Sequence, residues 1–274
     1  MRTASLLITC ALLAAITCAV LAATGSPAGT LKQAPLQYDF DQPLKYRFTS
    51  ESYYCEGDVA RFSQGTSATI LLRKVGEEKP GVTLLTCEVS DISRPGNPPE
   101  ALKPFVFQIK VKTDGQVVAV TEAPNSPLRG ASGLQRGLVT DVAQHAFLLL
   151  NAKNVGDEWS VTLPGADLLL TLSSYPRRNP EVMRFWLVDE VVLEGTKCEV
   201  ITGFGDPNKT PDPKGYSHYS PRVDSATVFF DRAKGRIQRA RWVGRFEDPE
   251  PYPQQKPNSA ERLTNIYTLQ LVTN

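Results

Sequence analysis

The chain has 274 residues, of which 30 are basic, 29 are acidic and 41% are hydrophobic. A charge this close to neutral gives no reason to expect nucleic acid or an anionic membrane as the partner of the whole chain. The length suits one large β domain or two small ones, and no shift in composition marks a linker between two.

The first 23 residues, MRTASLLITCALLAAITCAVLAA, are predicted to form a secretory signal peptide. Arg2 precedes an apolar run from about Leu6 to Leu21, and small residues follow that run. The run is too short and too early in the chain to favour a permanent membrane span. We therefore expect residues 24–274 to be a soluble single domain without a transmembrane anchor, secreted or, in a bacterial host, periplasmic.

Three cysteines remain after removal of the signal: Cys55, Cys87 and Cys198. An odd number permits at most one internal disulfide and leaves one thiol over. We expect one structural bridge, which joins Cys198 to Cys55 or Cys87, and one buried thiol. The spacing is wide and lacks a C-x-x-C motif, so it indicates neither zinc binding nor dithiol chemistry. No metal and no cofactor are predicted.

Five strands are expected before the middle of the chain, because apolar and polar residues alternate there with a period of two. The first contains LKYRFTSES, and the clearest is PFVFQIKVK, which Thr113-Asp114-Gly115 joins to QVVAV as a hairpin. The expected strands cover about residues 38–52, 66–74, 82–92, 105–112 and 116–120.

One long helix is predicted over residues 132–150, SGLQRGLVTDVAQHAFLLL. Ser132 followed by Gln135 has the spacing of a capping box at its start. His145 lies on the polar edge, where we expect a satisfied or solvated side chain rather than a catalytic one. The apolar residues recur every three or four positions and form a wide stripe that includes Leu134, Leu138, Val142 and Ala146.

About seven strands are expected after the helix, and short turns join most of them, which predicts antiparallel pairing. A single helix between two blocks of strands indicates a sheet that curls around it. The predicted fold is therefore mostly β, an antiparallel β-barrel of roughly 11–12 strands wrapped around one long central α-helix at residues 132–150. The later strands are expected within residues 154–174, 183–193, 197–204, 226–231, 236–246 and 262–272.

The sequence lacks the motifs of the common catalytic classes. It contains no G-x-S-x-G elbow, no P-loop and no H-E-x-x-H pair. No pattern places two carboxylates on opposite sides of a cleft, as glycoside hydrolysis requires. We therefore predict that the protein is not an enzyme.

A cluster of arginines is the main candidate for a binding surface. Arg239, Arg241 and Arg245 alternate onto one face of a predicted strand that also contains Trp242. Because arginine and tryptophan anchor many interfaces, this strand is a candidate partner-binding site. The alternative is an outward strand face whose charges meet acidic neighbours. A separate surface candidate is Asn208, which begins an Asn-Lys-Thr glycosylation acceptor if the host is eukaryotic.

Several motifs, taken in order, resemble the N-terminal β-barrel domain of the vitellogenin family of large lipid transfer proteins. YRFTSESYYCEGDVARFSQGTSATILLRKV is similar to that domain's Tyr-rich first strand, long loop and second strand. LKPFVFQIKVKTDGQVVAV resembles its Pro-Phe strand and the hairpin that follows. SGLQRGLVTDVAQHAFLLL resembles its central helix, and DEVVLEGTKCEVITGF the Glu…Gly…Cys hairpin after it. The resemblance spans about residues 38–272.

This resemblance implies a single β-barrel domain that takes part in lipid transport or binds a lipid, a receptor or a lipoprotein partner. The family's further lipid-enclosing domains are not part of the matched stretch, so contact with partner proteins carries over more directly than the lipid cavity. The VGDEW strand start and the FD…G hairpin also resemble secreted bacterial β proteins. The alternative is therefore a secreted or periplasmic structural or interaction protein without a lipid ligand.

Overall fold

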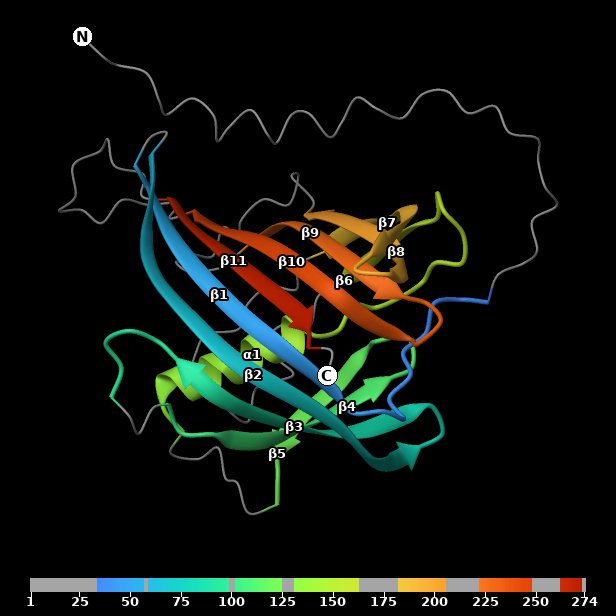
Figure 1. The fold of residues 1–274 in the computed structure, drawn as a ribbon, viewed down its shortest axis with the longest axis horizontal. Helices are drawn as coiled ribbons and strands as arrows, with labels where there is room; N and C mark the ends of the chain where they lie inside the picture. The colour runs from blue at the N-terminus through green and yellow to red at the C-terminus, as the bar shows by residue number, and fades with distance from the viewer. Residues whose placement is uncertain are drawn as a thin grey trace, which may run out of the picture. The chain divides into compact units, whose positions relative to one another are not determined.

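A computed structural model describes residues 34–56, 59–98, 102–124, 131–162, 182–205, 222–247 and 262–272. These residues form eleven strands and one helix (Figure 1). The strands are β1 (Leu44–Glu56), β2 (Val59–Lys79), β3 (Val82–Ser93), β4 (Phe105–Lys112), β5 (Val117–Glu122), β6 (Glu158–Thr162), β7 (Val182–Leu193), β8 (Thr196–Gly205), β9 (Arg222–Asp231), β10 (Arg236–Glu247) and β11 (Arg262–Leu271). The helix is α1 (Gly133–His145).

All the strands belong to one antiparallel sheet with the order β5-β4-β3-β2-β1-β11-β10-β9-β8-β7-β6. Neighbours in the sheet are neighbours in the chain except at the centre, where β1 pairs with β11 over Tyr46–Cys55. The two ends of the order, β5 and β6, are the strands that flank α1 in the chain. The mostly β, antiparallel prediction is therefore confirmed, whereas the predicted closed barrel is wrong, because β5 and β6 are not paired in the described residues.

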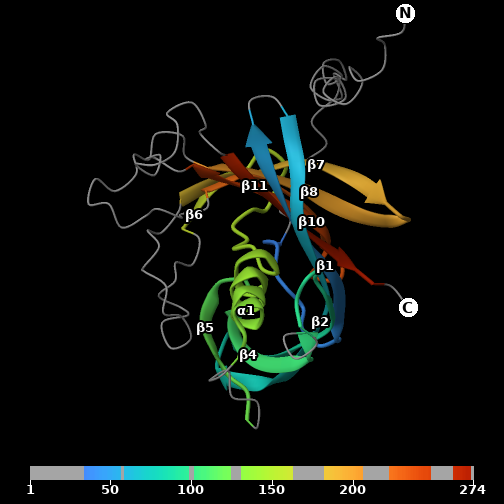
Figure 2. The same ribbon diagram turned by 90° about the vertical axis from the view of Figure 1, so that its left-hand side faces the viewer.

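The sheet curves around α1, which lies on its concave side (Figure 2). We call the face toward α1 the inner face and the opposite one the outer face. Inner-face side chains alternate along each strand, as Tyr46 and Phe48 do in β1, and they pack with Leu138, Val139 and Val142 of α1 into one hydrophobic core. Period-two alternation in the strands and a stripe on the helix therefore position the core as expected.

The helix is shorter than predicted. Ser132 caps it with the expected capping box, in which its Oγ accepts from the Gln135 amide and the Gln135 side chain accepts from the Ser132 amide. It ends at His145, and the predicted continuation to residue 150 is wrong. Phe147, Leu148 and Leu150 stay buried, but in a non-helical segment. A short apolar run fits a buried extended segment as well as a helix, so periodicity does not separate the two.

One end of the curled sheet is crossed by residues 34–40, which lie before β1. The Tyr38 amide donates to the Thr113 carbonyl in the β4–β5 turn, and the Asp39 amide donates to the Gly235 carbonyl in the β9–β10 turn. The Tyr38 hydroxyl accepts from the Leu148 amide at 2.9 Å. Its ring packs on Phe40, Phe147 and Phe230. We call this the strap end of the sheet.

Candidate functional site

The predicted arginine strand is β10, and its side chains divide between the two faces. Arg239 and Arg241 point outward, whereas Ala240 and Trp242 point inward and are 0% exposed. Trp242 therefore does not share the arginine face, and the sequence interpretation that grouped them is wrong on this residue. Successive strand residues face opposite sides of a sheet, which is the physical reason. The side chain of Arg245 lies outside the described part of the structure.

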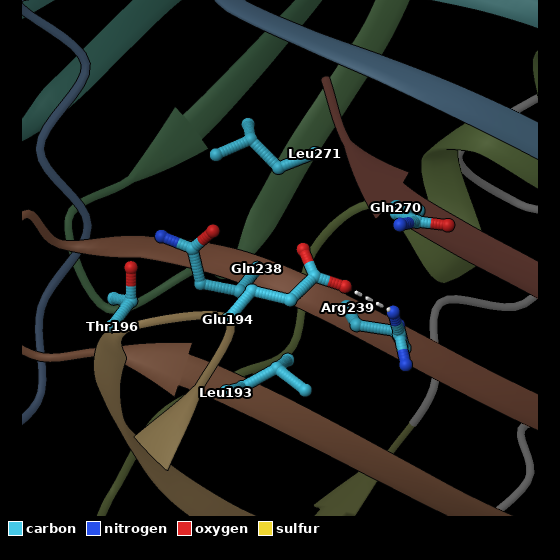
Figure 3. Close-up of a pocket in the computed structure, with 7 residues that line it drawn as sticks. All are labelled: Leu193, Glu194, Thr196, Gln238, Arg239, Gln270 and Leu271. Carbon is cyan, nitrogen blue, oxygen red and sulfur yellow. Dashed lines mark hydrogen bonds and ion pairs between the residues drawn. The ribbon is translucent and has the colours of Figure 1, made fainter. Parts of the chain in front are cut away.

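Arg239 lines a hollow on the outer face, between the tip of the β7–β8 hairpin and the ends of β10 and β11 (Figure 3). Its Nη2 lies 2.9 Å from Glu194 Oε1, and this ion pair crosses the hollow. The space is about 90 Å³, which suits a small polar group rather than a whole ligand. The lining residues are Leu193, Glu194, Thr196, Gln238, Arg239, Gln270 and Leu271.

Glu194 holds an unusual backbone conformation at the tip of this hairpin. Its φ is +51° and that of Gly195 is +79°, so both central residues of the two-residue turn are left-handed. Turns of this kind favour Asn-Gly, because a longer side chain is strained at positive φ. Glu194 therefore destabilises the turn, but from this position its carboxylate reaches Arg239.

Replacement of Glu194 by asparagine tests what the ion pair contributes. Asparagine relaxes the turn by about 1 kcal/mol, and loss of an exposed ion pair costs about 0–1 kcal/mol. We therefore expect the free energy of unfolding of Glu194→Asn, measured with urea, to change by less than about 0.5 kcal/mol. Arg239→Gln breaks the same pair and keeps the strain, so it is expected to be the less stable variant. A Glu194→Asn variant that is less stable than Arg239→Gln would contradict this explanation.

Arg241 lies in an outer-face row that continues across the neighbouring strands. It pairs with Thr227 of β9, Thr227 pairs with Thr202 of β8, and Thr202 pairs with Trp186 of β7. The Trp186 ring contacts that of Phe204 with 5.9 Å between centroids. Phe204 is 51% exposed. The structure thus brings together on one face an exposed arginine and two aromatic rings, which alternation within β10 alone does not show.

Beyond Arg241, on β1, the outer face carries a Tyr–Glu pair. The Tyr53 hydroxyl donates to Glu51 Oε2 at 2.8 Å. This hydrogen bond to a carboxylate is the main reason that the pKa of Tyr53 is raised, and the positive charge of Arg241 opposes the rise. The arginine therefore faces a site that already contains a carboxylate, so the face is mixed in charge rather than purely basic.

The inner face holds a second cluster, which we call the inner polar strip: Ser52 of β1, Asn265 and Tyr267 of β11, and Trp242 of β10. Ser52 Oγ donates to Asn265 Oδ1 at 2.7 Å, and Asn265 Nδ2 donates to the Tyr267 hydroxyl at 3.3 Å. Trp242 Nε1 is buried and has no hydrogen-bond partner among the described residues. A polar cluster therefore lies inside an otherwise apolar core.

His145 covers this strip from the last turn of α1. Its ring stacks on Tyr267 at 4.1 Å between centroids and meets the edge of Trp242 at 5.5 Å. Its Nδ1 lies 2.8 Å from the Asp141 carbonyl. The side chain is 4% exposed. The sequence places His145 on the polar edge of the helix, and the sheet buries this residue while the rest of that edge is only partly buried. Alternation along β11 predicts that Asn265 and Tyr267 lie on one face of the strand. It does not predict that a helix packs on that face.

The structure leaves the predicted disulfide unformed. Cys87 and Cys198 are both free and buried, which contradicts a bridge between them and any bridge from Cys198. Cys87 is on β3 and Cys198 on β8, and five strands lie between them in the sheet order. The side chain of Cys55 is outside the described residues.

Both thiols are expected to resist alkylation in the native protein. Burial raises the pKa of each, and the nearby carboxylates Asp231 and Glu199 raise that of Cys198 further. Because the thiolate is the reactive form, a maleimide at neutral pH should label neither residue until the protein unfolds. Peptide mapping after denaturation without reductant should then find both alkylated. A disulfide-linked peptide containing Cys198 would contradict the structure.

Other predicted features are placed as follows. The signal peptide and Asn208 lie outside the described residues. The part of the chain that the structure describes contains no group of three or more His, Cys, Asp or Glu side chains arranged to hold a metal. Nor does that part contain a helix that is long and apolar enough to cross a bilayer.

Comparison with known proteins gives only weak matches. No family model and no curated protein matches the chain. It is similar to a solved DUF1329 family protein from Desulfovibrio piger, at 8% identity and a TM-score of 0.18, over 86% of this chain and 88% of that one. It is also similar to a domain from Vibrio parahaemolyticus provisionally assigned to outer membrane lipoprotein sorting, at 10% identity and a TM-score of 0.18, over 84% and 83%. Similarities at this level establish no shared function.

Proposed function

We propose that this protein is an exported, non-catalytic lipid-binding protein that holds an acyl chain on the inner face of its curled sheet. The observation that carries the proposal is an open sheet whose concave side packs against one short helix and the buried segments that precede β1 and follow the helix. Since β5 and β6 are not paired in the described residues, the curl can widen without breaking a ladder between them. A closed barrel with a filled interior has no such freedom.

The contact between α1 and the sheet is of the kind that an acyl chain can replace. The buried residues of the helix are the aliphatic Leu138, Val139, Val142 and Ala143, together with His145 in its last turn. If an acyl chain replaces the helix against the sheet, the sheet still buries a similar apolar area. The hydrophobic stabilisation from that area therefore changes little. The inner face presents a row of apolar side chains that runs through Phe48, Leu269, Ala240, Val228 and Ile201. The resemblance to large lipid transfer proteins implies the same class of ligand.

Native mass spectrometry of the secreted protein tests this function. We expect bound lipid in the purified protein and uptake of an added phospholipid after delipidation. Val228→Thr places a hydroxyl on the inner face with little change of shape and should weaken uptake several-fold. Thr227→Val makes the reverse change on the outer face of the same strand and should leave uptake unchanged. Preparations that are free of lipid and take up none would overturn the proposal.

A second candidate function is recognition of a partner protein through the outer face. The supporting observation is the exposed Arg241 in register with Trp186 and its neighbour Phe204, since arginine and aromatic residues anchor protein interfaces. Crosslinking of the wild-type protein should then recover a partner that Arg239→Gln/Arg241→Gln/Arg245→Gln loses. Recovery of the same partner by both proteins would remove this candidate.

A further inference from the structure

The inner face changes from apolar to polar along the direction of its central strands. Nearer the strap end, Leu269 of β11 pairs with Phe48 of β1 and Ala240 of β10. Two residues farther along, Tyr267 pairs with Ser50 and Trp242. After two more residues, Asn265 pairs with Ser52 and Gly244. The inner polar strip thus occupies the part of the inner face that is remote from the strap.

The strip is buried, but its hydrogen bonds are incomplete. Ser52, Asn265 and Tyr267 are each at most 9% exposed, and hydrogen bonds run from Ser52 to Asn265 and from Asn265 to the Tyr267 hydroxyl. Beside it, Trp242 is fully buried and its Nε1–H has no acceptor in the described structure. A buried N–H without a partner is rare in native proteins and calls for a specific explanation, of which a bound group is one. The strip therefore presents one donor for an oxygen that the protein does not supply.

A residue that packs on Trp242 belongs to the element that the proposed function displaces. The His145 ring lies edge-on to Trp242 and stacks on Tyr267 at the end of α1. A shift of α1 that makes room for an acyl chain would also uncover the side of Trp242 and Tyr267 on which His145 packs, while Phe185 of β7 stays against Trp242. The polar strip and the apolar rows would then form one continuous surface, polar at one end and apolar at the other.

We propose that the inner polar strip binds the carbonyl oxygen of an acyl ester, with Trp242 Nε1 as the hydrogen-bond donor and the acyl chain directed toward the strap end. This inference rests on the proposed lipid-binding function and specifies its ligand. The inner polar strip contains no lysine or arginine, so a carboxylate bound there would be buried without a permanent cation in the strip. An uncharged ester avoids that penalty and still offers the acceptor that the strip lacks.

The test compares three probes of equal chain length: a fatty-acid methyl ester, the free fatty acid and an alkane without a carbonyl group. Their affinities for the mature protein are measured by native mass spectrometry titration. Trp242→Phe keeps the aromatic packing and removes the donor, so it should weaken ester binding about tenfold and leave alkane binding unchanged. Trp186→Phe makes the same change on the outer face and should alter neither. Asn265→Leu, which removes a polar member of the strip, should reproduce the selective loss if Trp242→Phe fails to fold.

Tryptophan fluorescence gives the orientation of the bound chain. A methyl ester brominated near its carbonyl end should quench the wild-type protein more than one brominated near its methyl end. That difference should become much smaller in Trp242→Phe, in which Trp159 is the remaining core tryptophan, and persist in Trp186→Phe. The opposite order of quenching would overturn the proposed orientation.

The outcomes separate this inference from the function on which it rests. If no probe binds, the proposed function itself is wrong. If all three bind with equal affinity, or if Trp242→Phe weakens alkane and ester alike, lipid binding stands and the ester site is overturned. If the free acid binds more tightly than the ester and only the acid responds to Trp242→Phe, the site takes a carboxylate and the ester assignment is wrong.

Discussion

Val142→Asp in α1 is expected to unfold the domain. Val142 is 0% exposed in the core between the helix and the sheet, so the new carboxylate would be buried without a partner. A change of this kind costs more than about 4 kcal/mol, which is a large part of the stability of a typical domain. Urea titration followed by far-ultraviolet circular dichroism should show that the native baseline is lost.

Gln144→Asp, two residues along the same helix, is the matched control. Gln144 is only half-buried, and a negative charge near a helix C-terminus is unfavourable by about 0.3–1 kcal/mol. A mild loss of this size is expected. Equal intolerance at both positions would show instead that the sheet encloses the polar edge of α1 as completely as its apolar stripe.

Arg232→Met should cause the second large loss of stability. Arg232 lies in the β9–β10 turn and connects three separate parts of the chain. Its Nε pairs with Glu199 Oε1 at 2.6 Å, its Nη1 donates to the Ala34 carbonyl at 2.6 Å, and its Nη2 donates to the Lys153 carbonyl at 2.9 Å. The Glu199 side chain is 5% exposed. Removal of the guanidinium leaves a buried carboxylate unpaired, which costs about 3–5 kcal/mol.

Lys234→Met in the same turn is the control, because Lys234 is exposed and the change there should be nearly neutral. Arg232→Met/Glu199→Leu should recover most of the stability, because an apolar pair replaces a buried ion pair with little net loss. The test compares the urea midpoints of the wild-type protein, Arg232→Met, Lys234→Met and the double variant. A single Arg232→Met loss no larger than that of Lys234→Met would show that the three contacts contribute little.

The two large effects bear on the proposed function in different ways. Val142 belongs to the helix that an acyl chain would displace, whereas Arg232 holds the strap end, where residues 34–40 cross the sheet. A ligand that enters beside α1 leaves the contacts of Arg232 intact. We therefore expect lipid uptake to depend on the inner face and the polar strip rather than on the strap.

Part of the candidate site on β10 could be predicted from the sequence. Alternation in β10 places Arg239 and Arg241 on one face, and the same rule places Trp242 on the other. The grouping of Trp242 with the arginines was therefore an error of interpretation, not a limit of the pattern. The partners of these residues could not be predicted from the sequence. Glu194, which pairs with Arg239, is 45 residues away in the chain, and it has a backbone φ that glutamate seldom adopts.

The sequence by itself determined the local elements: the alternating strands, the Ser132–Gln135 cap and the apolar stripe of α1. These follow from side-chain periods of two and of about 3.6 residues, which are properties of neighbouring residues. Only the tertiary structure decided that β1 pairs with β11, that the sheet stays open at β5 and β6, and that α1 ends at His145 over a buried tryptophan. Those outcomes depend on contacts between residues far apart in the chain, such as Ser52 with Asn265, and no local period encodes them.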